Sequence, residues 1–589
     1  MPKSADNRSV DNIRHSLAHL LAAAVLQRFP KAKLGIGPII ENGFYYDFAV
    51  PRGFTPDDLK EFEKIIKRLI KDGLPFKGKK ITPSEGRKLF SAGGGSAFGG
   101  NDQPFKLELI QDFVKEKKQL TAYSTGDVFI DLCKGGHVKN TKEINPDAFK
   151  LISTAGAYWK GSEKNPQLQR IYGVAFKTKK ELDAYIAQVE EAERRDHKKL
   201  GAELELFMFH HTSPGMPYWL PKGVILYNEL VNFWRDEHSR RGYQEIVSPI
   251  LNKKELYETS GHYDHYWPEM FVADIGENEL YGVKAMNCPN AMIVFGSKSR
   301  SYRELPLRLS DTDALHRYER SGVLNGLFRV REFRQDDAHI FVSEDQIESE
   351  YEAVFEIVKR FYSIFGMKYE YRLGTRPEGF LGDIKTWNIA EKKLKAILKR
   401  SGKKFTILEG DGAFYGPKVD ILMKDAIGRE WQMGTIQLDF NQPRRFELKY
   451  TAKDGKERTP VIIHRVIYGS LERFIGILIE HYAGAFPTWL SPVQAQILPV
   501  SRKHEAASKK VFKTLQDSGI RALLTDSNET IGKRIREGEI GKVPYLLVVG
   551  DKEIKSNSVA VRKRGRKDIQ TKKLKSFLEE IKREIDTRS

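Results

Sequence analysis

The sequence predicts an α+β protein of several domains, and three observations carry this prediction. The chain has 589 residues, which is more than a single hydrophobic core accommodates. Strand-like segments in its middle, such as VDILMKD (419–425), REWQMGTIQLDF (429–440) and VIIHRVI (461–467), lack regular helical crossovers. This pattern favours an antiparallel sheet with helices packed on it. Beyond residue 490 strand and helix patterns alternate, which indicates a small α/β domain.

Two stretches are expected to separate the domains. Residues 178–206 are rich in Glu, Lys, Arg and Ala, with Gly201 as the one breaker, and predict a long exposed linker helix. Prolines interrupt the pattern at residues 487–492. The expected divisions are a short tail (1–10), an N-terminal α+β domain (11–177), the linker helix (178–206), a central domain (207–489) and a C-terminal domain (490–589).

The elements of the last two domains follow from local patterns. A long helix is predicted over 224–242. The C-terminal domain is predicted to contain strands at 495–500, 520–526 and 543–550, a helix at 504–519 and a closing helix. The glycine-rich stretch 91–101 (SAGGGSAFGGN) predicts a flexible surface loop, because it lacks the Lys-Ser/Thr ending of a phosphate-binding loop.

Composition narrows the class of protein. Apolar residues make up 40% of the chain and aromatic residues 11%, as in ordinary folded proteins. No apolar run approaches the ~18 residues of a membrane span, and the polar N-terminus does not resemble a signal peptide. Two cysteines are too few for a disulfide scaffold and suit a reducing compartment. We therefore expect a cytoplasmic protein without a membrane segment.

The positive charge is unevenly distributed. The formal net charge is +19, and residues 491–589 hold 23 Lys and Arg against 13 Asp and Glu, a net of +10. Such an excess is typical of a protein that binds a polyanion, most simply nucleic acid. A solvated basic surface without a partner is the alternative.

An arginine inside an apolar helix is the most informative local feature. A strand-like run ends at Gly469, Ser470 can cap a new helix, and Arg473 enters that helix among Phe, Ile and Leu residues. A helix that is apolar on nearly every side is normally buried, and a buried guanidinium needs an anion. That anion is either a core glutamate or a phosphate, which arginine binds in bidentate geometry.

Cysteine and histidine residues form two further patterns. His15 and His19 are four residues apart in an apolar helical pattern, and Cys133 has His137 four residues on. Together they could bind a tetrahedral metal or form an acid–base site for hydrolysis. The alternative for His15 and His19 is that they are partly buried, hydrogen-bonded histidines without a catalytic or metal-binding role. Cys288 has no local partner, and alone it would be a small buried apolar residue.

Residues 316–341 (HRYERSGVLNGLFRVREFRQDDAHIF) indicate the enzyme class. They resemble motif 2 of the class II aminoacyl-tRNA synthetases, GSLERF (469–474) resembles motif 3, and residues 227–249 resemble motif 1, the dimer-interface element. The segments MNCP, QDDAHIF, AFYGPKVD, WQMGTIQLDF and IHR resemble the threonyl-tRNA synthetase family over nearly the whole chain. The resemblance implies a homodimer that uses ATP, L-threonine and tRNA(Thr).

The resemblance also assigns roles in amino-acid activation. Arg317 would hold the α-phosphate of ATP, Glu319 would bind the adenine amino group, and Arg329 and Arg473 would hold the terminal phosphates. Mg²⁺ would bridge the phosphates. Catalysis by positioning and charge stabilisation fits this set, because the substrate carboxylate is itself the nucleophile.

Threonine selection implies a metal. Valine is nearly isosteric with threonine, and an apolar pocket separates the two only about a hundredfold. The resemblance implies one Zn²⁺ held by Cys288, His339 and His464, with an open position for the amino and hydroxyl groups of threonine. The remaining pocket residues that it implies are Asp337, Tyr415, Gln432 and Gln437.

Serine also carries an amino and a hydroxyl group and lacks only one methyl group of threonine. That methyl group provides only ~1–3 kcal/mol of discrimination. The resemblance therefore implies a second site that hydrolyses seryl-tRNA(Thr), made by His15, His19, Cys133 and His137 with residues 155–173 nearby. We expect no metal there. The C-terminal domain resembles an anticodon-binding domain.

The sequence departs from the family in a few places. About ten residues precede HSLAH, so we expect a form without the N-terminal ubiquitin-like domain. Asn290, Ala291 and Asn325 replace residues that are common in the family. An inactive RNA-binding regulator would have lost an essential arginine or zinc ligand, and all are present. An enzyme for another amino acid, such as proline, or a separate editing hydrolase would not need both residue sets.

Overall fold

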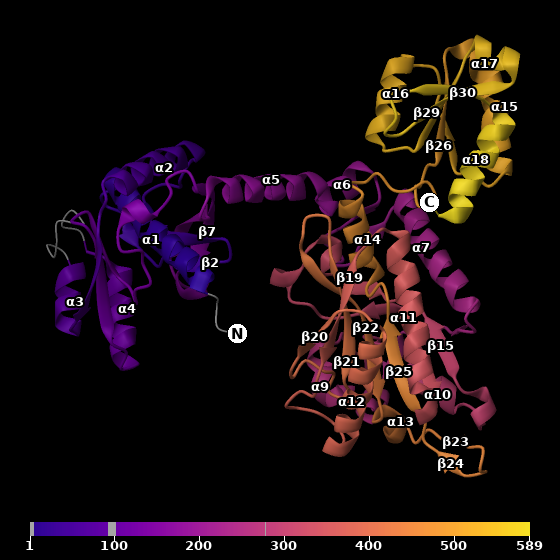
Figure 1. Ribbon diagram of the computed structural model, residues 1–589, viewed down its shortest axis with the longest axis horizontal. Coiled ribbons are helices and arrows are strands. Elements are labelled where there is room, and N and C mark those ends of the chain that lie inside the picture. The colour runs from indigo at the N-terminus through magenta and orange to yellow at the C-terminus, as the bar shows by residue number, and fades with distance from the viewer. Residues whose placement is uncertain (1–4, 92–101, 277–278, 589) are drawn as a thin grey trace. The chain divides into compact units, whose positions relative to one another are not determined.

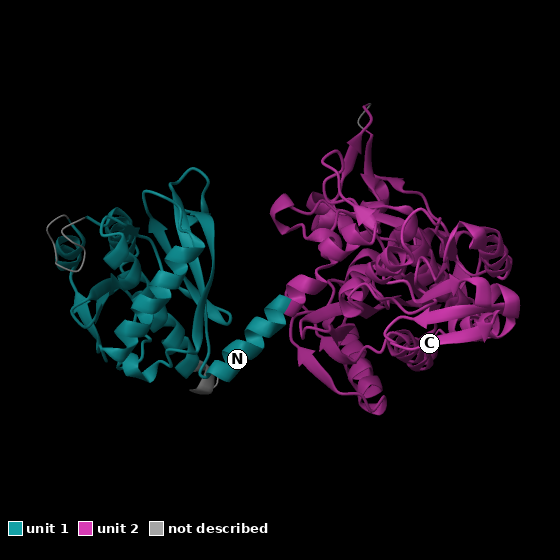
Figure 2. Ribbon diagram, turned by 90° about the horizontal axis from the view of Figure 1, so that it is seen from above, with its two compact units in different colours: residues 1–190 teal, residues 191–589 magenta. Residues whose placement is uncertain are grey.

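The computed structural model describes residues 5–91, 102–276 and 279–588 (Figure 1). The chain divides into two compact units, Met1–Glu190 and Glu191–Ser589 (Figure 2). Apart from Ser91, the glycine-rich stretch that predicts a surface loop lies outside the described residues.

The first unit is the expected α+β domain. Its elements are α1 (Ala5–Arg28), α2 (Pro56–Lys71), α3 (Pro83–Phe90), α4 (Pro104–Lys115), β1 (Lys33–Leu34), β2 (Ile39–Ile40), β3 (Gly43–Ala49), β4 (Phe76–Ile81), β5 (Leu120–Thr125), β6 (Phe129–Leu132), β7 (Phe149–Tyr158) and β8 (Gln167–Ala175). Strands β1, β2, β3, β8 and β7 form one antiparallel sheet, and β4, β5 and β6 form another.

Helix α1 lies at the centre of this unit. Its alanine-rich stretch, including Ala18, Ala22 and Ala24, is fully buried in the core with Phe44 and Tyr46 of β3. Small side chains let a helix approach a sheet closely, and alanine is also the best helix former. The helix thereby places its two histidines beside the end of β6.

The expected linker helix is two helices. Helix α5 (Lys179–Arg195) ends one residue before Asp196, and α6 (His197–Glu203) begins one residue after it. The Asp196 carboxylate accepts the Lys198 backbone N–H at 2.7 Å, which is an N-cap and starts a new helix. Gly201 does not break α6. A Cβ there would lie 2.3 Å from the Phe207 ring, so packing requires glycine.

The second unit contains the antiparallel sheet that the sequence predicts. Within the described residues it has eight strands in the order β11 (Gln244–Glu245), β15 (Leu307–Asp311), β18 (Asp337–Val342), β25 (Val461–Val466), β22 (Glu430–Asp439), β21 (Lys418–Lys424), β19 (Tyr369–Gly374) and β20 (Phe405–Leu408). Only the outermost pairs, β11–β15 and β19–β20, are parallel. The central strands are therefore paired on both sides and buried.

Helices cover this sheet and share one apolar core with it. They are α7 (Pro221–Ser239), α11 (Ile347–Ile364), α12 (Ile384–Arg400) and α14 (Leu471–His481) (Figure 1). Helix α14 contributes Ile475, Ile477 and Ile479, all fully buried. The smaller elements are α8 (Lys254–Ser260), α9 (His262–Tyr266), α10 (Cys288–Gly296), α13 (Gln442–Arg445), β9 (Phe207–Met208), β10 (Tyr218–Trp219), β12 (Leu251–Lys253), β13 (Val272–Asp274), β14 (Leu280–Val283), β16 (Ala314–His316), β17 (Glu332–Arg334), β23 (Tyr450–Thr451) and β24 (Glu457–Arg458).

The C-terminal segment forms the expected α/β domain. Its sheet has the order β27 (Ala522–Leu524), β26 (Ala495–Pro499), β28 (Tyr545–Val549), β29 (Ser558–Lys563) and β30 (Ile569–Lys573). The helices are α15 (Glu505–Asp517), α16 (Ile531–Ile540), α17 (Asp551–Ser556) and α18 (Leu574–Thr587). In the described parts of the chain, no helix has the length and apolar character needed to cross a membrane.

Candidate functional site

A cationic cavity of about 360 Å³ lies at one end of the central sheet. It gathers residues that are far apart in the sequence, which is how a folded enzyme assembles a binding site. The lining residues are Arg317, Glu319, Phe328, Arg329, Val330, Phe333, Gln335, Gln432, Met433, Thr435, Val466, Gly469, Ser470 and Arg473. All four residues that the sequence assigns to ATP are therefore in one cavity.

Arg473 enters this cavity from the first turn of α14. The Ser470 hydroxyl accepts the Arg473 backbone N–H at 3.2 Å and caps the helix, as the sequence predicts. Arg473 Nε donates to the Phe328 carbonyl at 3.0 Å. Within the described residues, no carboxylate oxygen lies within 4.0 Å of its guanidinium, so the core-glutamate alternative is wrong. Burial, and then the nearby Arg329 and Arg317, lower the pKa of Arg473.

The other cavity residues are held by specific contacts. Arg317 follows β16, donates through Nε to the Ala285 carbonyl at 3.3 Å, and lies 5.0 Å from the centre of the Phe333 ring. Arg329 Nη2 lies 2.8 Å from Glu319 Oε2. Three arginines share one small cavity with a single paired carboxylate, so the cavity is suited to a polyanion such as a triphosphate.

Cys288, His339 and His464 form the second cluster. Cys288 is the first residue of α10, and the two histidines are direct cross-strand partners on β18 and β25. Their candidate ligand atoms all lie within 4.8 Å of one another, and all three side chains are buried. His339 Nδ1 is buried without a hydrogen-bond partner. One thiol, two imidazoles and an orphaned ring nitrogen fit a zinc ion with one open position.

To bind a metal the histidines of this cluster must be neutral, and the thiol must lose its proton. Burial raises the pKa of the Cys288 thiol, and burial lowers the pKa of His339 well below its usual value. His464 Nε2 lies 3.0 Å from Asp439 Oδ2. A carboxylate on the second nitrogen is the usual partner of a metal-binding histidine, because it fixes the tautomer.

The residues assigned to threonine lie partly beside this cluster. Tyr415 donates its hydroxyl to Gln437, and its ring centre lies 5.2 Å from that of His464. Asp337 accepts from Asn287 Nδ2 at 3.3 Å, and burial raises its pKa to about 6. Gln432 instead lines the arginine cavity, where Arg372 and Asp420 fix its amide at 2.9 and 2.8 Å.

Sequence reasoning missed three residues of this region. His262 Nε2 lies 3.9 Å from the Cys288 thiol, Asp439 contacts His464, and Asn287 contacts Asp337. Asn287 directly precedes Cys288, and that adjacency is a signal in the sequence. In the sequence, Asp439 is 25 positions from His464 and His262 is 26 positions from Cys288. Strand pairing in the fold brings β22, which carries Asp439, beside β25.

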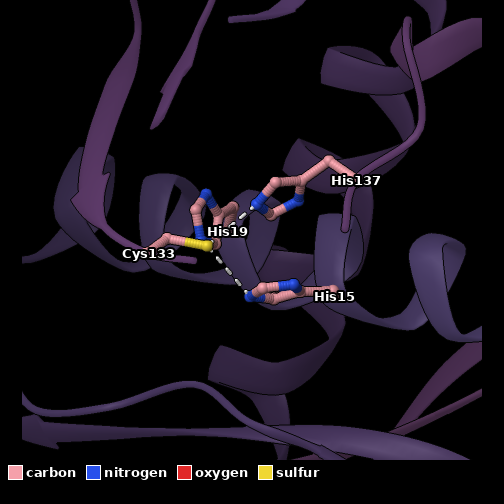
Figure 3. Close-up of side chains that lie close together, drawn as sticks. All are labelled: His15, His19, Cys133 and His137. Carbon is pink, nitrogen blue, oxygen red and sulfur yellow. Dashed lines mark hydrogen bonds between the residues drawn. The ribbon is translucent and has the colours of Figure 1, made fainter. Parts of the chain in front are cut away.

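The N-terminal unit holds the third cluster (Figure 3). His15 and His19 come from α1, and Cys133 and His137 come from the loop after β6. The Cys133 thiol lies 3.4 Å from His15 Nε2 and 3.2 Å from His137 Nε2. The four ligand-type atoms all lie within 4.8 Å of one another. The structure therefore brings together all four residues of the predicted set.

This cluster borders a cavity of about 420 Å³, and burial favours the neutral forms of its thiol and imidazoles. Burial raises the pKa of Cys133 to about 12. Burial, and then the neighbouring His19 and His15, lower the pKa of His137 to about 2. Neutral imidazoles can accept a proton at ordinary pH, but the low pKa of His137 makes it a weaker base than an imidazole whose pKa lies near neutral pH.

An ion pair that the sequence did not reveal lies against this cluster. Lys106 of α4 contacts Asp131 of β6 at 2.5 Å, and both side chains are buried. Asp131 also accepts the Tyr46 hydroxyl at 2.6 Å, and it lies 3.8 Å from His19 Nε2. Asp131 is two residues before Cys133, but no spacing in the sequence links it to Lys106.

Three family descriptions match the chain. Residues 266–482 match the "tRNA synthetase class II core domain (G, H, P, S and T)". Residues 494–584 match the "Anticodon binding domain". Residues 120–172 match the "Threonyl and Alanyl tRNA synthetase second additional domain". These matches agree with the three structural regions described above.

Whole-chain relatives and solved structures agree. The threonine–tRNA ligase of Carboxydothermus hydrogenoformans is 48% identical over 98% of this chain and 89% of its own length. That of Thermotoga maritima is 48% identical over 99% of this chain and 89% of its own length. The RNA binding domain of threonyl-tRNA synthetase from Cryptosporidium parvum is 41% identical, with a TM-score of 0.64, over 66% of this chain and 98% of that one. The chain therefore belongs to the threonine–tRNA ligase family of class II aminoacyl-tRNA synthetases.

Proposed function

We propose that this threonine–tRNA ligase activates L-threonine in the arginine cavity, selects it with zinc, and hydrolyses seryl-tRNA(Thr) at the N-terminal cluster. The observation that carries the proposal is the single cavity that gathers Arg317, Arg329 and Arg473. The neighbouring Cys288 and histidine cluster supports the choice of amino acid.

In the activation step a threonine carboxylate oxygen attacks the α-phosphorus of ATP, and pyrophosphate leaves. Arg317 stabilises the negative charge that develops on the α-phosphate, and Arg329 and Arg473 stabilise the pyrophosphate. Mg²⁺ enters with ATP as part of the substrate. Glu319, which pairs with Arg329 at 2.8 Å, would accept a hydrogen bond from the adenine amino group.

Cys288, His339 and His464 would hold the zinc ion. When bound, zinc would supply Lewis acidity toward the amino and hydroxyl groups of threonine, and valine has no hydroxyl to match. Asp337 receives the substrate ammonium group, and Tyr415 and Gln437 line the same pocket. Gln432 lies in the arginine cavity and would contact the substrate from there.

In the editing step water attacks the ester carbonyl of seryl-tRNA(Thr), and the ester C–O bond to the terminal ribose breaks. A neutral imidazole of the His15, His19 and His137 set accepts a proton from the water, and the ribose oxygen takes up a proton as it leaves. The buried Lys106–Asp131 pair lies beside His19, with Asp131 Oδ2 3.8 Å from His19 Nε2. The proposal needs no metal in this cluster.

The proposal also includes tRNA(Thr) and a second copy of the chain as partners, and a cytoplasmic location. The basic C-terminal domain binds the anticodon region of tRNA(Thr) through phosphate and base contacts. A homodimer is supported by apolar side chains exposed near β11 and β12, in and next to the motif 1 segment, with Val247 84%, Ile250 46% and Leu251 54% exposed. Exposed apolar groups of this size favour an interface. A cytoplasmic location is supported by two free cysteines, each placed beside histidines.

The test is threonine-dependent ATP–pyrophosphate exchange on protein with a measured zinc content, with serine and valine in parallel. We expect exchange with threonine, weaker exchange with serine and none with valine. If the zinc-loaded protein showed no exchange with threonine, the proposal would fail, and an RNA-binding role without catalysis would replace it.

A further inference from the structure

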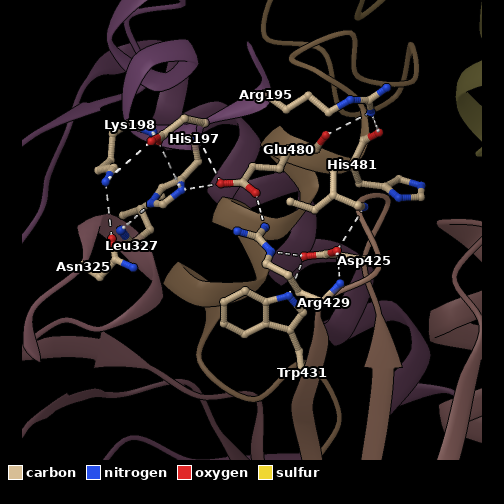
Figure 4. A network of polar contacts seen from close by, with 12 residues as sticks. Arg195, His197, Lys198, Asn325, Leu327, Asp425, Arg429, Trp431, Glu480 and His481 are labelled. Carbon is tan, nitrogen blue, oxygen red and sulfur yellow. Dashed lines mark hydrogen bonds and ion pairs between the residues drawn. The ribbon is translucent and has the colours of Figure 1, made fainter. Parts of the chain in front are cut away.

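The backbone turn that contains Leu327 contacts a buried histidine outside the motifs (Figure 4). His197 is the first residue of α6, and only 1% of its surface is exposed. Its Nε2 accepts the Leu327 backbone N–H at 3.0 Å, and its Nδ1 lies 2.8 Å from Glu480 Oε1. Because Nε2 acts as an acceptor, the ring proton is on Nδ1 and is donated to Glu480.

The partner of His197 is itself held in place. Glu480 lies in the last turn of α14, and its other carboxylate oxygen accepts from Arg429. Arg429 Nε also donates to Asp425 at 2.6 Å. Arg195 donates to the backbone carbonyls of Glu480 and His481 at 3.2 and 3.0 Å. The glutamate therefore offers His197 a fixed acceptor.

His197 is linked to the proposed ATP site through two residues of the chain. Phe328, which follows Leu327, has its ring centre 4.0 Å from that of His197. The Phe328 carbonyl accepts Arg473 Nε at 3.0 Å, and Arg329 comes next. At Gly326, whose φ is +49°, a Cβ would lie 2.3 Å from His197 Nε2. The turn thus approaches the imidazole as closely as a glycine allows.

Asp196, His197 and Glu480 could also be considered as metal ligands, since their ligand-type atoms lie within 4.8 Å of one another. Their hydrogen bonds exclude that role. Both ring nitrogens of His197 are engaged with protein groups, and Asp196 caps α6 through the Lys198 N–H. The cluster is a hydrogen-bonded support.

We propose that His197 is a positioning residue for amino-acid activation: it holds the Leu327–Arg329 turn so that Arg329 and Arg473 meet the phosphates of ATP together. This inference rests on the proposed ATP site. The residue touches no substrate, so its effect should fall on ATP binding. Threonine recognition at the zinc cluster and hydrolysis in the N-terminal unit should be unchanged.

The test compares His197→Asn with His197→Gln in the full chain. Asparagine can donate to Glu480 from the position of Nδ1 but cannot reach Leu327, whereas glutamine is one methylene longer and can place its carbonyl near the position of Nε2. We expect H197N to raise the KM for ATP in pyrophosphate exchange about tenfold, the equivalent of one lost hydrogen bond. The KM for threonine and the hydrolysis of seryl-tRNA should stay within about twofold of the wild type. H197Q should recover most of the affinity for ATP.

The outcomes are distinguishable. An unchanged KM for ATP in folded H197N, or an H197Q enzyme as impaired as H197N, would overturn the inference while the wild-type activity stands. A wild-type enzyme without exchange would instead overturn the proposed function. If H197N does not fold, Gly326→Ala tests the same contact from the turn, because its Cβ would displace the imidazole. A normal KM for ATP in G326A would then overturn the inference.

Discussion

Asp439 Oδ2 accepts from His464 Nε2 at 3.0 Å, and this contact joins β22 to β25 beside the Cys288 thiol. The other oxygen of Asp439 accepts the backbone N–H groups of Asn441 and Gln442 at 2.7 and 3.0 Å. The carboxylate is thus fixed before any metal binds. With its proton directed to Asp439, His464 keeps a lone pair on Nδ1 for a metal.

The first prediction concerns this contact. In Asp439→Asn an amide N–H can face His464 and favour the opposite tautomer, which places the proton on the metal-binding nitrogen. We expect zinc affinity to fall by about 10–100-fold. Zinc content after dialysis against a graded chelator measures it, with the exposed Asp454→Asn as the control. If D439N retained zinc as the wild type does, the tautomer of His464 would have no effect on zinc affinity.

How far the sequence predicts the fold depends on how local the signals are. Strand β25 and the cap of α14 at Ser470 were predictable, because apolar runs and capping residues act over a few positions. The break at Asp196 was not, although aspartate is a good N-cap residue. The charged, breaker-free composition on both sides favours one continuous helix, and the buried contact of His197 with Glu480 decides otherwise.

The candidate sites also divide into residues that the sequence could name and residue pairs that only the fold reveals. Resemblance to a family could name Cys288, His339 and His464, and the structure places them together. It could not separate Gln432 from Gln437, because the contacts of Arg372 and Asp420 hold Gln432 in the arginine cavity, whereas Gln437 accepts the Tyr415 hydroxyl. Lys106 and Asp131 form a pair through folding alone, since they belong to α4 and β6.

The second prediction concerns phosphate binding. Arg473→Gln keeps a donor for the Phe328 carbonyl but removes the charge proposed to bind the phosphates of ATP. We expect kcat/KM for ATP in pyrophosphate exchange to fall about 100-fold or more. The exposed Arg444→Gln serves as a control, and seryl-tRNA hydrolysis should be unaffected. Normal ATP kinetics in R473Q would show that Arg473 does not bind ATP.

The third prediction separates editing from synthesis. His19→Ala removes a fully buried imidazole beside Asp131. Hydrolysis of preformed seryl-tRNA(Thr) should slow about 100-fold, while threonine-dependent exchange stays at the wild-type level. Deacylation of labelled seryl-tRNA(Thr) provides the measurement. Equal loss of both activities would indicate misfolding, and unchanged deacylation would place the editing site elsewhere.

The fourth prediction concerns the dimer. Val247 is 84% exposed in the single chain, and a carboxylate buried at an apolar interface is strongly unfavourable. Val247→Asp should therefore shift the protein from dimer to monomer in analytical ultracentrifugation. Ile540→Asp, at a 60% exposed position of α16, should leave the mass unchanged. A wild-type protein that sediments as a monomer would contradict the homodimer directly.

The fifth prediction concerns stability and pH. Glu472, next to Arg473, is buried, and burial raises the pKa of its carboxyl group from 4.5 to about 7. One of its oxygens accepts the Arg334 backbone N–H at 2.9 Å and the Ser470 hydroxyl at 3.1 Å. The folded protein therefore keeps a proton that the unfolded chain releases at lower pH.

Between pH 4.5 and about 7 the folded state binds more protons than the unfolded state at this group, so the free energy of unfolding falls as the pH rises. The contribution of Glu472 is fully present below pH 4.5 and is lost through pH 7, for a total of about 3 kcal/mol.

Glu472→Gln stays neutral and can still accept from Arg334. The variant should thus lose less stability than the wild type between pH 5 and 8, as followed by tryptophan-detected thermal unfolding. The exposed Glu579→Gln should behave like the wild type, and an equal loss in E472Q and wild type would show that Glu472 is ionised in the folded protein throughout this range.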